Sequence, residues 1–180
     1  MKKFLSLSLF VFSTLYSISQ DYTPIDQGSK VKFVINNFGI ATGGTFEGLS
    51  GIIKYDPNNP TQATFSVSVE VKTIDTDIES RDKDLRKQHY FDVETYPTIT
   101  FTSTRVTKTN TKDYLYMFGN ITIKGITKEI KFPFKAIPKD GGFLFEGSFD
   151  LNRRDFKVGS KSMSLSDELT VTLSVFAKKA

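Results

Sequence analysis

Few side chains of this chain could do chemistry, and the single histidine is the first to consider. The sequence of 180 residues contains one histidine and no cysteine. This excludes disulfides, a cysteine nucleophile, thiolate metal sites and metal sites with several histidines from one chain. His89 could act as a general base only beside a nucleophile, and no G-x-S-x-G motif nominates a serine. A histidine near the end of a helix is the simpler interpretation, and we expect no catalytic residue.

A cluster of carboxylates is the second candidate. Its members are Asp75, Asp77, Glu79, Asp82 and Asp84. A calcium loop of the EF-hand type that began at the first of them would need glycine at position 80 and glutamate at position 86, where the chain has Ser80 and Arg86. Acidic residues are also favoured in the first turn of a helix, where they interact with the helix dipole. The cluster therefore predicts the start of a helix, and we expect no metal ligand and no cofactor.

The third candidate is the run Arg153-Arg154-Asp155. Arginine can bind a phosphate or another oxygen anion through paired hydrogen bonds, so Arg153 could lie at the mouth of a pore and contact a ligand headgroup. The alternative is a salt-bridged turn in which Arg153 pairs with a carboxylate such as Asp82 or Asp84, since most such arginines are structural. Both interpretations stay open, and Arg153 is retained as a candidate ligand-binding residue.

Alternating apolar and polar residues fill most of the chain after residue 19, which predicts strands with one buried side. The pattern is clearest where Phe65, Val67 and Val69 alternate with serines. In the last such segment Phe176 falls in the row opposite the apolar residues, together with threonines and a serine. The segments are 31–38, 44–55, 63–71, 98–107, 114–124, 128–137, 142–151 and 169–177.

Eight antiparallel strands with one apolar side must stack as a sandwich or close into a barrel, and closure removes exposed edges. Segment 81–89 lacks the alternation and predicts a short helix that Ser80 or Asp82 caps. The sequence thus predicts an all-β fold, a single eight-stranded antiparallel barrel with one short helix. A membrane-inserted barrel is disfavoured, because the chain ends in Lys178-Lys179-Ala180 without the usual terminal aromatic residue and shows no aromatic girdles.

The first residues predict a secretion signal that precedes the folded domain. Lys2 and Lys3 come before an apolar stretch, and Ser17-Ile18-Ser19 supplies small residues for cleavage. We predict a signal peptide at 1–19, one domain at 20–180 and a periplasmic or secreted location. The apolar stretch is too short for a membrane anchor. Without residues 1–19 the chain has 24 − 2 = 22 basic and 20 acidic side chains, and a net charge of +2 demands no nucleic-acid partner.

Several sequence strings resemble the YceI family, and they occur in the family's order over nearly the whole predicted domain. Departures are Tyr22, where many members have tryptophan, Asn36-Asn37, where many have a turn that contains histidine, and Lys157, which often is glycine in the family. The matching strings are Gly39 through Phe46-Glu47-Gly48 to Gly51, Thr76-Asp77, Asp82-Lys83-Asp84-Leu85, His89-Tyr90-Phe91-Asp92-Val93, Tyr96-Pro97 through Thr104, Gly119 through Lys128, and Asn152 through Phe156.

The resemblance implies a lipocalin-like barrel of secreted bacterial proteins that hold a long isoprenoid or other lipid chain in the pore, with no catalytic motif. From composition alone, the phenylalanine rings could either fill such a barrel or line a slot for a ligand. A packed-core stress-protective protein and an enzyme that acts on a lipid therefore remain alternatives. The candidate ligand-binding residues are Phe33, Phe65, Val67, Val69, Phe101, Phe132, Phe134, Phe145, Phe149 and Arg153.

Overall fold

The computed structural model describes residues 20–180, and the predicted signal peptide lies outside the described residues. One α-helix, α1 (Glu79–Leu85), and two 3-10 turns, η1 (Pro60–Gln62) and η2 (Arg153–Phe156), interrupt the strands. The strands are β1 (Gln20–Pro24), β2 (Lys30–Asn37), β3 (Ile40–Tyr55), β4 (Thr64–Asp75), β5 (Thr98–Lys108), β6 (Leu115–Ile123), β7 (Ile126–Lys139), β8 (Gly142–Asn152) and β9 (Leu165–Lys179).

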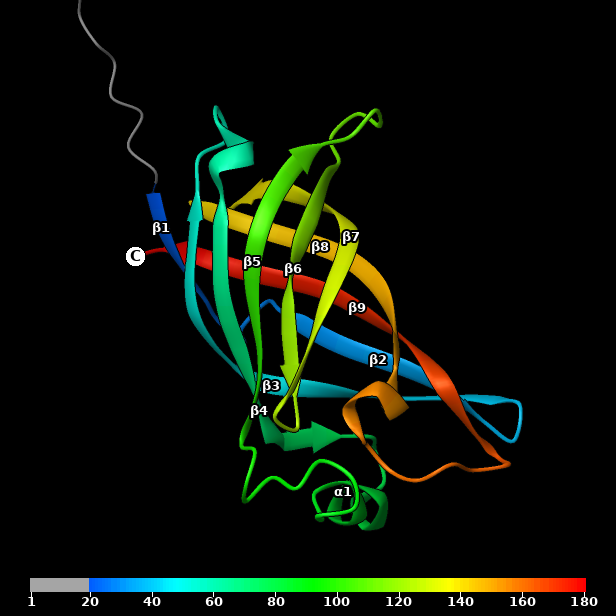
Figure 1. Cartoon of the computed structure of the whole chain (residues 1–180). Helices are drawn as coiled ribbons and strands as arrows, with labels where there is room; N and C mark the ends of the chain where they lie inside the picture. The colour runs from blue at the N-terminus through cyan, green and yellow to red at the C-terminus, as the bar shows by residue number, and fades with distance from the viewer. Residues whose placement is uncertain (1–19) are drawn as a thin grey trace, which may run out of the picture.

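The strands close into a barrel, with α1 below one end (Figure 1). Strands β3, β2, β9, β8, β7, β6, β5 and β4 follow one another around the wall, and β4 pairs back with β3. All of these pairings are antiparallel. The predicted eight-stranded barrel with one short helix is confirmed.

A ninth, short strand was absent from the sequence prediction. Strand β1 lies between β3 and β9, with Tyr22 opposite Ile53 and Thr23 opposite Lys178. Strand β2 lies between the same two strands over most of their length. Where β2 ends, β1 takes its place in the wall. Its five residues contain Pro24 and no clear alternation, so local sequence carries little strand signal there.

The apolar side of the strands faces inward, as the alternation predicts. Phe65 and Phe134 are 6% and 2% exposed, while Thr64 and Ser66 face water. Phe176 departs from the pattern: it points out of the barrel but is only 5% exposed. The connection between β1 and β2 covers it: a Cβ atom on Gly28 would lie 3.7 Å from Cδ1 of the ring, and the Ser29 hydroxyl accepts a hydrogen bond from the Phe176 amide at 2.8 Å. A tertiary contact therefore buries a ring that lies in the polar row of the alternation.

Helix α1 begins earlier than predicted and neither proposed cap is correct. Its N-cap is Ile78, which makes no side-chain capping hydrogen bond, and Ser80 lies inside the helix. Asp82 is buried and accepts hydrogen bonds from both the amide and the hydroxyl of Thr76. The carboxylate is thus used to fix the end of β4 against the helix, which explains why it does not cap.

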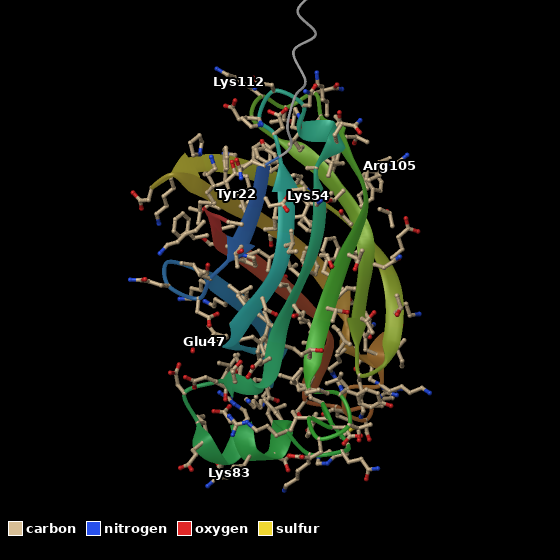
Figure 2. All side chains as sticks on the ribbon, turned by 90° about the vertical axis from the view of Figure 1, so that its left-hand side faces the viewer. Tyr22, Glu47, Lys54, Lys83, Arg105 and Lys112 are labelled. Carbon is tan, nitrogen blue, oxygen red and sulfur yellow. The ribbon has the colours of Figure 1, made fainter. Side chains whose placement is uncertain are left out.

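One end of the barrel is closed by an aromatic plug that consists of Tyr22, Tyr55 and Phe143. The Tyr55 and Phe143 ring centroids are 4.8 Å apart, those of Tyr22 and Phe143 are 5.3 Å apart, and both pairs meet edge to face. Such contacts add to the stabilisation from burial. Figure 2 shows Tyr22 near the end of the barrel that lies opposite Lys83 of α1. The plug and α1 therefore mark the two ends of the molecule.

Candidate ligand-binding cavity

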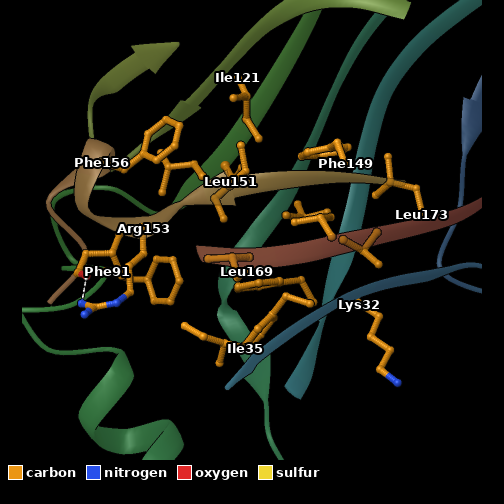
Figure 3. A pocket seen from close by; sticks show the side chains of 18 of the residues that line it. Lys32, Ile35, Phe91, Ile121, Phe149, Leu151, Arg153, Phe156, Leu169 and Leu173 are labelled. Carbon is orange, nitrogen blue, oxygen red and sulfur yellow. Dashed lines mark hydrogen bonds between the residues drawn. The ribbon is translucent and has the colours of Figure 1, made fainter. Parts of the chain in front are cut away.

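A cavity of about 870 Å³ occupies the barrel interior. Apolar side chains from several strands surround it, among them Phe149, Leu151, Leu169 and Leu173 (Figure 3). The interior is therefore hollow, in contrast to the packed core that we kept as an alternative. Its lining includes every residue that the sequence analysis proposed for ligand binding, namely Phe33, Phe65, Val67, Val69, Phe101, Phe132, Phe134, Phe145, Phe149 and Arg153.

The cavity is long and narrow. Along β9 alone, its lining runs from Leu165 to Val175. At about 3.3 Å per residue, with strands tilted roughly 40° to the barrel axis, these residues lie about 25 Å apart along the axis. The inner end is formed by Phe65, Phe134 and Phe145, and the aromatic plug fills the barrel beyond them. A site of this shape suits an extended chain.

Glycines in the wall explain how so many rings leave the interior hollow. A Cβ atom on Gly119 would lie 2.4 Å from Cζ of Phe101, and one on Gly147 would lie 3.0 Å from the Phe132 ring. Both glycines are in the inward-facing rows of their strands, β6 and β8. Each ring therefore rests directly on the backbone of the wall instead of projecting to the axis.

The open end, which we call the mouth, lies between α1 and the β2–β3 hairpin and carries most of the polar lining. Ser80, Arg81 and Asp84 line it on the helix side, and Asn37 and residues 160–162 line it on the other. Arg81 donates through Nε to the Thr76 hydroxyl at 2.8 Å and through Nη2 to the Thr76 carbonyl at 2.7 Å. No Nη1 partner is found among the described residues, so this nitrogen can meet a ligand.

Asp84 and His89 form a second polar group at the mouth. A hydrogen bond from Lys87, at 3.0 Å, holds the pKa of the Asp84 carboxyl below its usual value. His89 Nε2 lies 3.6 Å from Oδ2 of the same carboxylate. His89 thus lies beside an acid and lines the cavity, without a serine partner in the hydrogen bonds described for residues 20–180. The predicted helix over 81–89 is too long at this end, because α1 ends at Leu85 and His89 lies in the turn that follows.

Arg153 is buried beside the mouth and holds a loop. Its predicted partners Asp82 and Asp84 are wrong, because the guanidinium pairs with Asp167 at 2.6 Å. All five of its N–H groups have acceptors: Asp167 and the carbonyls of Val158, Ser160, Leu165 and Ser166, at 2.6–3.5 Å. This geometry supports the structural interpretation of Arg153, whereas contact with a ligand headgroup stays a prediction.

Much of the apolar lining was not among the predicted ligand-binding residues. For β9 the alternation contained the signal, because its apolar row is formed by Leu169, Val171, Leu173 and Val175. Phe91 lies in a turn and Phe156 at the end of η2, and neither segment has a periodicity that could identify them. The mouth residues Arg81 and Lys161 were also missed, since charged residues near helices and loops are common on any surface.

The arrangement is suited to burying a long apolar molecule while its polar end stays near water. Within residues 20–180, no three His, Asp or Glu side chains gather in a group that could hold a metal ion. The same part of the chain has no helix long and apolar enough to cross a bilayer. Because most of the side chains that line the cavity are apolar, removal of apolar surface from water is the main interaction that this interior offers.

Comparison with known proteins agrees with this geometry. A protein named YceI from Salmonella arizonae is 31% identical, with 94% of this chain and 93% of that protein covered. Burkholderia cenocepacia BcnA has a similar structure, with a TM-score of 0.78 and 24% identity over 83% of this chain and 96% of that one. A polyisoprenoid-binding domain from Saccharophagus degradans also has a similar structure, with a TM-score of 0.69 and 12% identity over 88% of this chain and 98% of that one. Since a YceI-like domain matches residues 22–177, the chain belongs to the YceI family.

Proposed function

We propose that this protein is a periplasmic or secreted carrier that binds an amphipathic lipid with an isoprenoid chain, such as a quinone or its precursor, inside the barrel. The observation that carries the proposal is the long apolar cavity with one closed end and a polar mouth. The Saccharophagus degradans domain with the same fold is described as polyisoprenoid-binding, which supports this class of ligand.

The binding energy in this proposal comes from burial. Each CH₂ group removed from water contributes about 0.8 kcal/mol before ordering costs. A lipid chain that lies along Phe149, Leu169 and Leu173 therefore needs no polar contact in the apolar part of the cavity. At the mouth, Arg81 offers a charged N–H group to an oxygen of the headgroup, which would favour anionic or carbonyl-bearing heads.

Binding without catalysis fits the same residues. His89 is more than half exposed and its near neighbour is Asp84, and general-base catalysis would need a nucleophile or substrate group within hydrogen-bonding distance. We expect a His89→Ala variant to bind lipid as the wild type does. Conversion of a bound lipid into a new product by the wild type alone would support the enzyme alternative.

Native mass spectrometry of the protein purified from its own host tests the proposal directly, since a bound lipid would appear as added mass. A Phe149→Glu variant should lose this mass and fail to take up isoprenoid alcohols, because an unpaired charge in the cavity is very costly. Thr172→Glu, an outward substitution on β9 beside Lys32, is the matched control. Equal lipid uptake by folded Phe149→Glu protein and wild type would contradict the proposed site.

A further inference from the structure

The most exposed large apolar side chains of the described residues gather at the mouth of the barrel. Phe38 is 80% exposed, Ile40 69% and Met163 107%, whereas the next most exposed, Ile52, reaches 52%. We call Phe38, Ile40 and Met163 the apolar tips. Exposed apolar side chains that cluster on loops indicate a site of interaction with another protein or with a membrane.

The apolar tips belong to two loops that are held together. The Phe38 amide donates to the Ser164 carbonyl at 2.8 Å, and Asn37 is paired with both Ile40 and Leu165. Figure 1 shows the β2–β3 hairpin and the loop before β9 projecting side by side beyond the barrel wall. The neighbouring residues Asn37, Thr42, Ser162 and Ser164 line the cavity, while the tips themselves do not. The tips therefore border the route into the cavity without forming the binding site.

Neither burial nor turn geometry accounts for Phe38. Its φ of 51°, followed by 76° at Gly39, is typical of a two-residue hairpin turn, where Asn or Gly is strongly preferred at the first position. A bulky ring in the left-handed region is uncommon and costs stability. Here the ring also points into water. Phe38 thus lowers the stability of the hairpin turn and places an apolar ring in water at the mouth.

The charges around the tips indicate what kind of surface they meet. Segments 36–46 and 158–166, which carry the tips, contain no Asp or Glu, and the second of them contains Lys161. In and just after α1, Glu79 pairs with Lys83 and Asp84 pairs with Lys87, so these four charges offset one another. Apolar side chains flanked by lysines are characteristic of contact with anionic lipid headgroups.

We propose that the apolar tips insert into the surface of a phospholipid bilayer and place the mouth of the barrel on the membrane, where a lipid can enter or leave. This inference rests on the proposed function, since it concerns how the cavity is loaded. Three side chains give shallow and reversible binding, which suits a carrier that must leave the membrane again.

Flotation with phosphatidylcholine vesicles, with and without phosphatidylglycerol, tests the docking. The wild type should float with the vesicles, more strongly with phosphatidylglycerol and less at high salt. Phe38→Asn should lower the partition coefficient about tenfold while its melting temperature stays the same or rises, because Asn suits the turn. Adding Met163→Ser should remove flotation. Ile52→Thr, which removes an exposed apolar group from the outer wall of β3, is the control and should float as the wild type does.

Loading from detergent separates this inference from the proposed function. Phe38→Asn and wild type should take up an isoprenoid alcohol equally from detergent micelles, because Phe38 does not line the cavity. If the wild type loads from detergent but never floats with vesicles, the docking proposal is wrong and the carrier function stands. If it does not load at all, the carrier function is contradicted instead. Self-association that is lost in Phe38→Asn, without vesicle binding, would assign the tips to a second copy and overturn the docking proposal.

Discussion

Lys157 occupies a backbone position that suits glycine. It follows η2 with a φ of 54° and closes that turn, and a left-handed conformation costs about 1–2 kcal/mol for residues with a Cβ atom. The contact of this residue with Lys124 uses only the Lys157 carbonyl, at 3.2 Å, so glycine would retain it.

We therefore expect Lys157→Gly to raise the free energy of unfolding by about 1 kcal/mol, measured by urea denaturation. Arg154→Gly is the matched control, because Arg154 is also exposed but has no positive φ. This second variant should lose stability. A loss of stability in Lys157→Gly would show instead that the lysine side chain itself contributes to the fold.

Tyr55 makes the closed end of the barrel sensitive to alkaline pH. Burial, with the nearby Asp56 carboxylate and Tyr22, raises the pKa of Tyr55 above its usual value of 10.0. The folded state thus holds the phenol proton more tightly than the unfolded chain does. This contribution to stability is present below about pH 10 and is lost as the pH rises through the folded-state pKa.

Tyr55→Phe should therefore reduce the loss of stability between about pH 9 and about pH 11. Denaturant unfolding at both pH values measures it. The wild type should lose more of its unfolding free energy over this interval than the variant loses. Parallel losses in the two proteins would mean that Tyr55 does not titrate with unfolding.

At the scale of elements, Arg153 links η2 to the loop that leads into β9. Replacing it with alanine leaves four carbonyls and Asp167 without their donor. We expect Arg153→Ala to lower the free energy of unfolding by about 3 kcal/mol, while the folded protein binds lipid with unchanged affinity. Calorimetry and lipid titration on the same variant separate the two roles. Weaker lipid binding with an unchanged melting temperature would assign Arg153 to the ligand headgroup.

The Phe101 ring of β5 lies against Gly119 of β6, and we expect this contact to set the width of the cavity. Gly119→Val should push this ring toward the axis. Overpacking costs about 1–3 kcal/mol, so the barrel should still fold, but the longest isoprenoid alcohol that it takes up should become shorter. Asn120→Val, an outward neighbour on β6, should leave uptake unchanged. Normal uptake by Gly119→Val would show that the ring does not define the bore.

At the scale of the whole molecule, alternation predicted the barrel because a closed sheet must bury one side of every strand. The same logic brought the nine apolar candidate residues to one cavity, whereas Arg153 was a candidate because of its charge. It could not predict β1, whose pairing with β3 and β9 exists only once the barrel closes. It also could not choose Asp167 among many carboxylates as the partner of Arg153, because that choice depends on the path of a loop without periodicity.

The local rules also fail where three-dimensional contacts override them. Phe176 lies in a polar row and is covered by the β1–β2 connection. Aspartate is a residue type that often caps helices, but Asp82 instead accepts a hydrogen bond from the Thr76 amide. Phe176 contacts a segment that is far away in the sequence. Thr76 is only six residues from Asp82, but their contact depends on how the chain turns between β4 and α1, which residue types alone do not specify.

The aromatic plug has a kinetic consequence for any cargo. With rings across one end of the shaft, a bound chain can leave only by the path along which it came, tail last. A newcomer cannot push the occupant forward, so replacement is strictly sequential and its rate cannot exceed the rate of departure. As the concentration of fresh lipid increases, the exchange rate should therefore reach a maximum that equals the dissociation rate constant of the bound lipid. A barrel open at both ends would not have this limit.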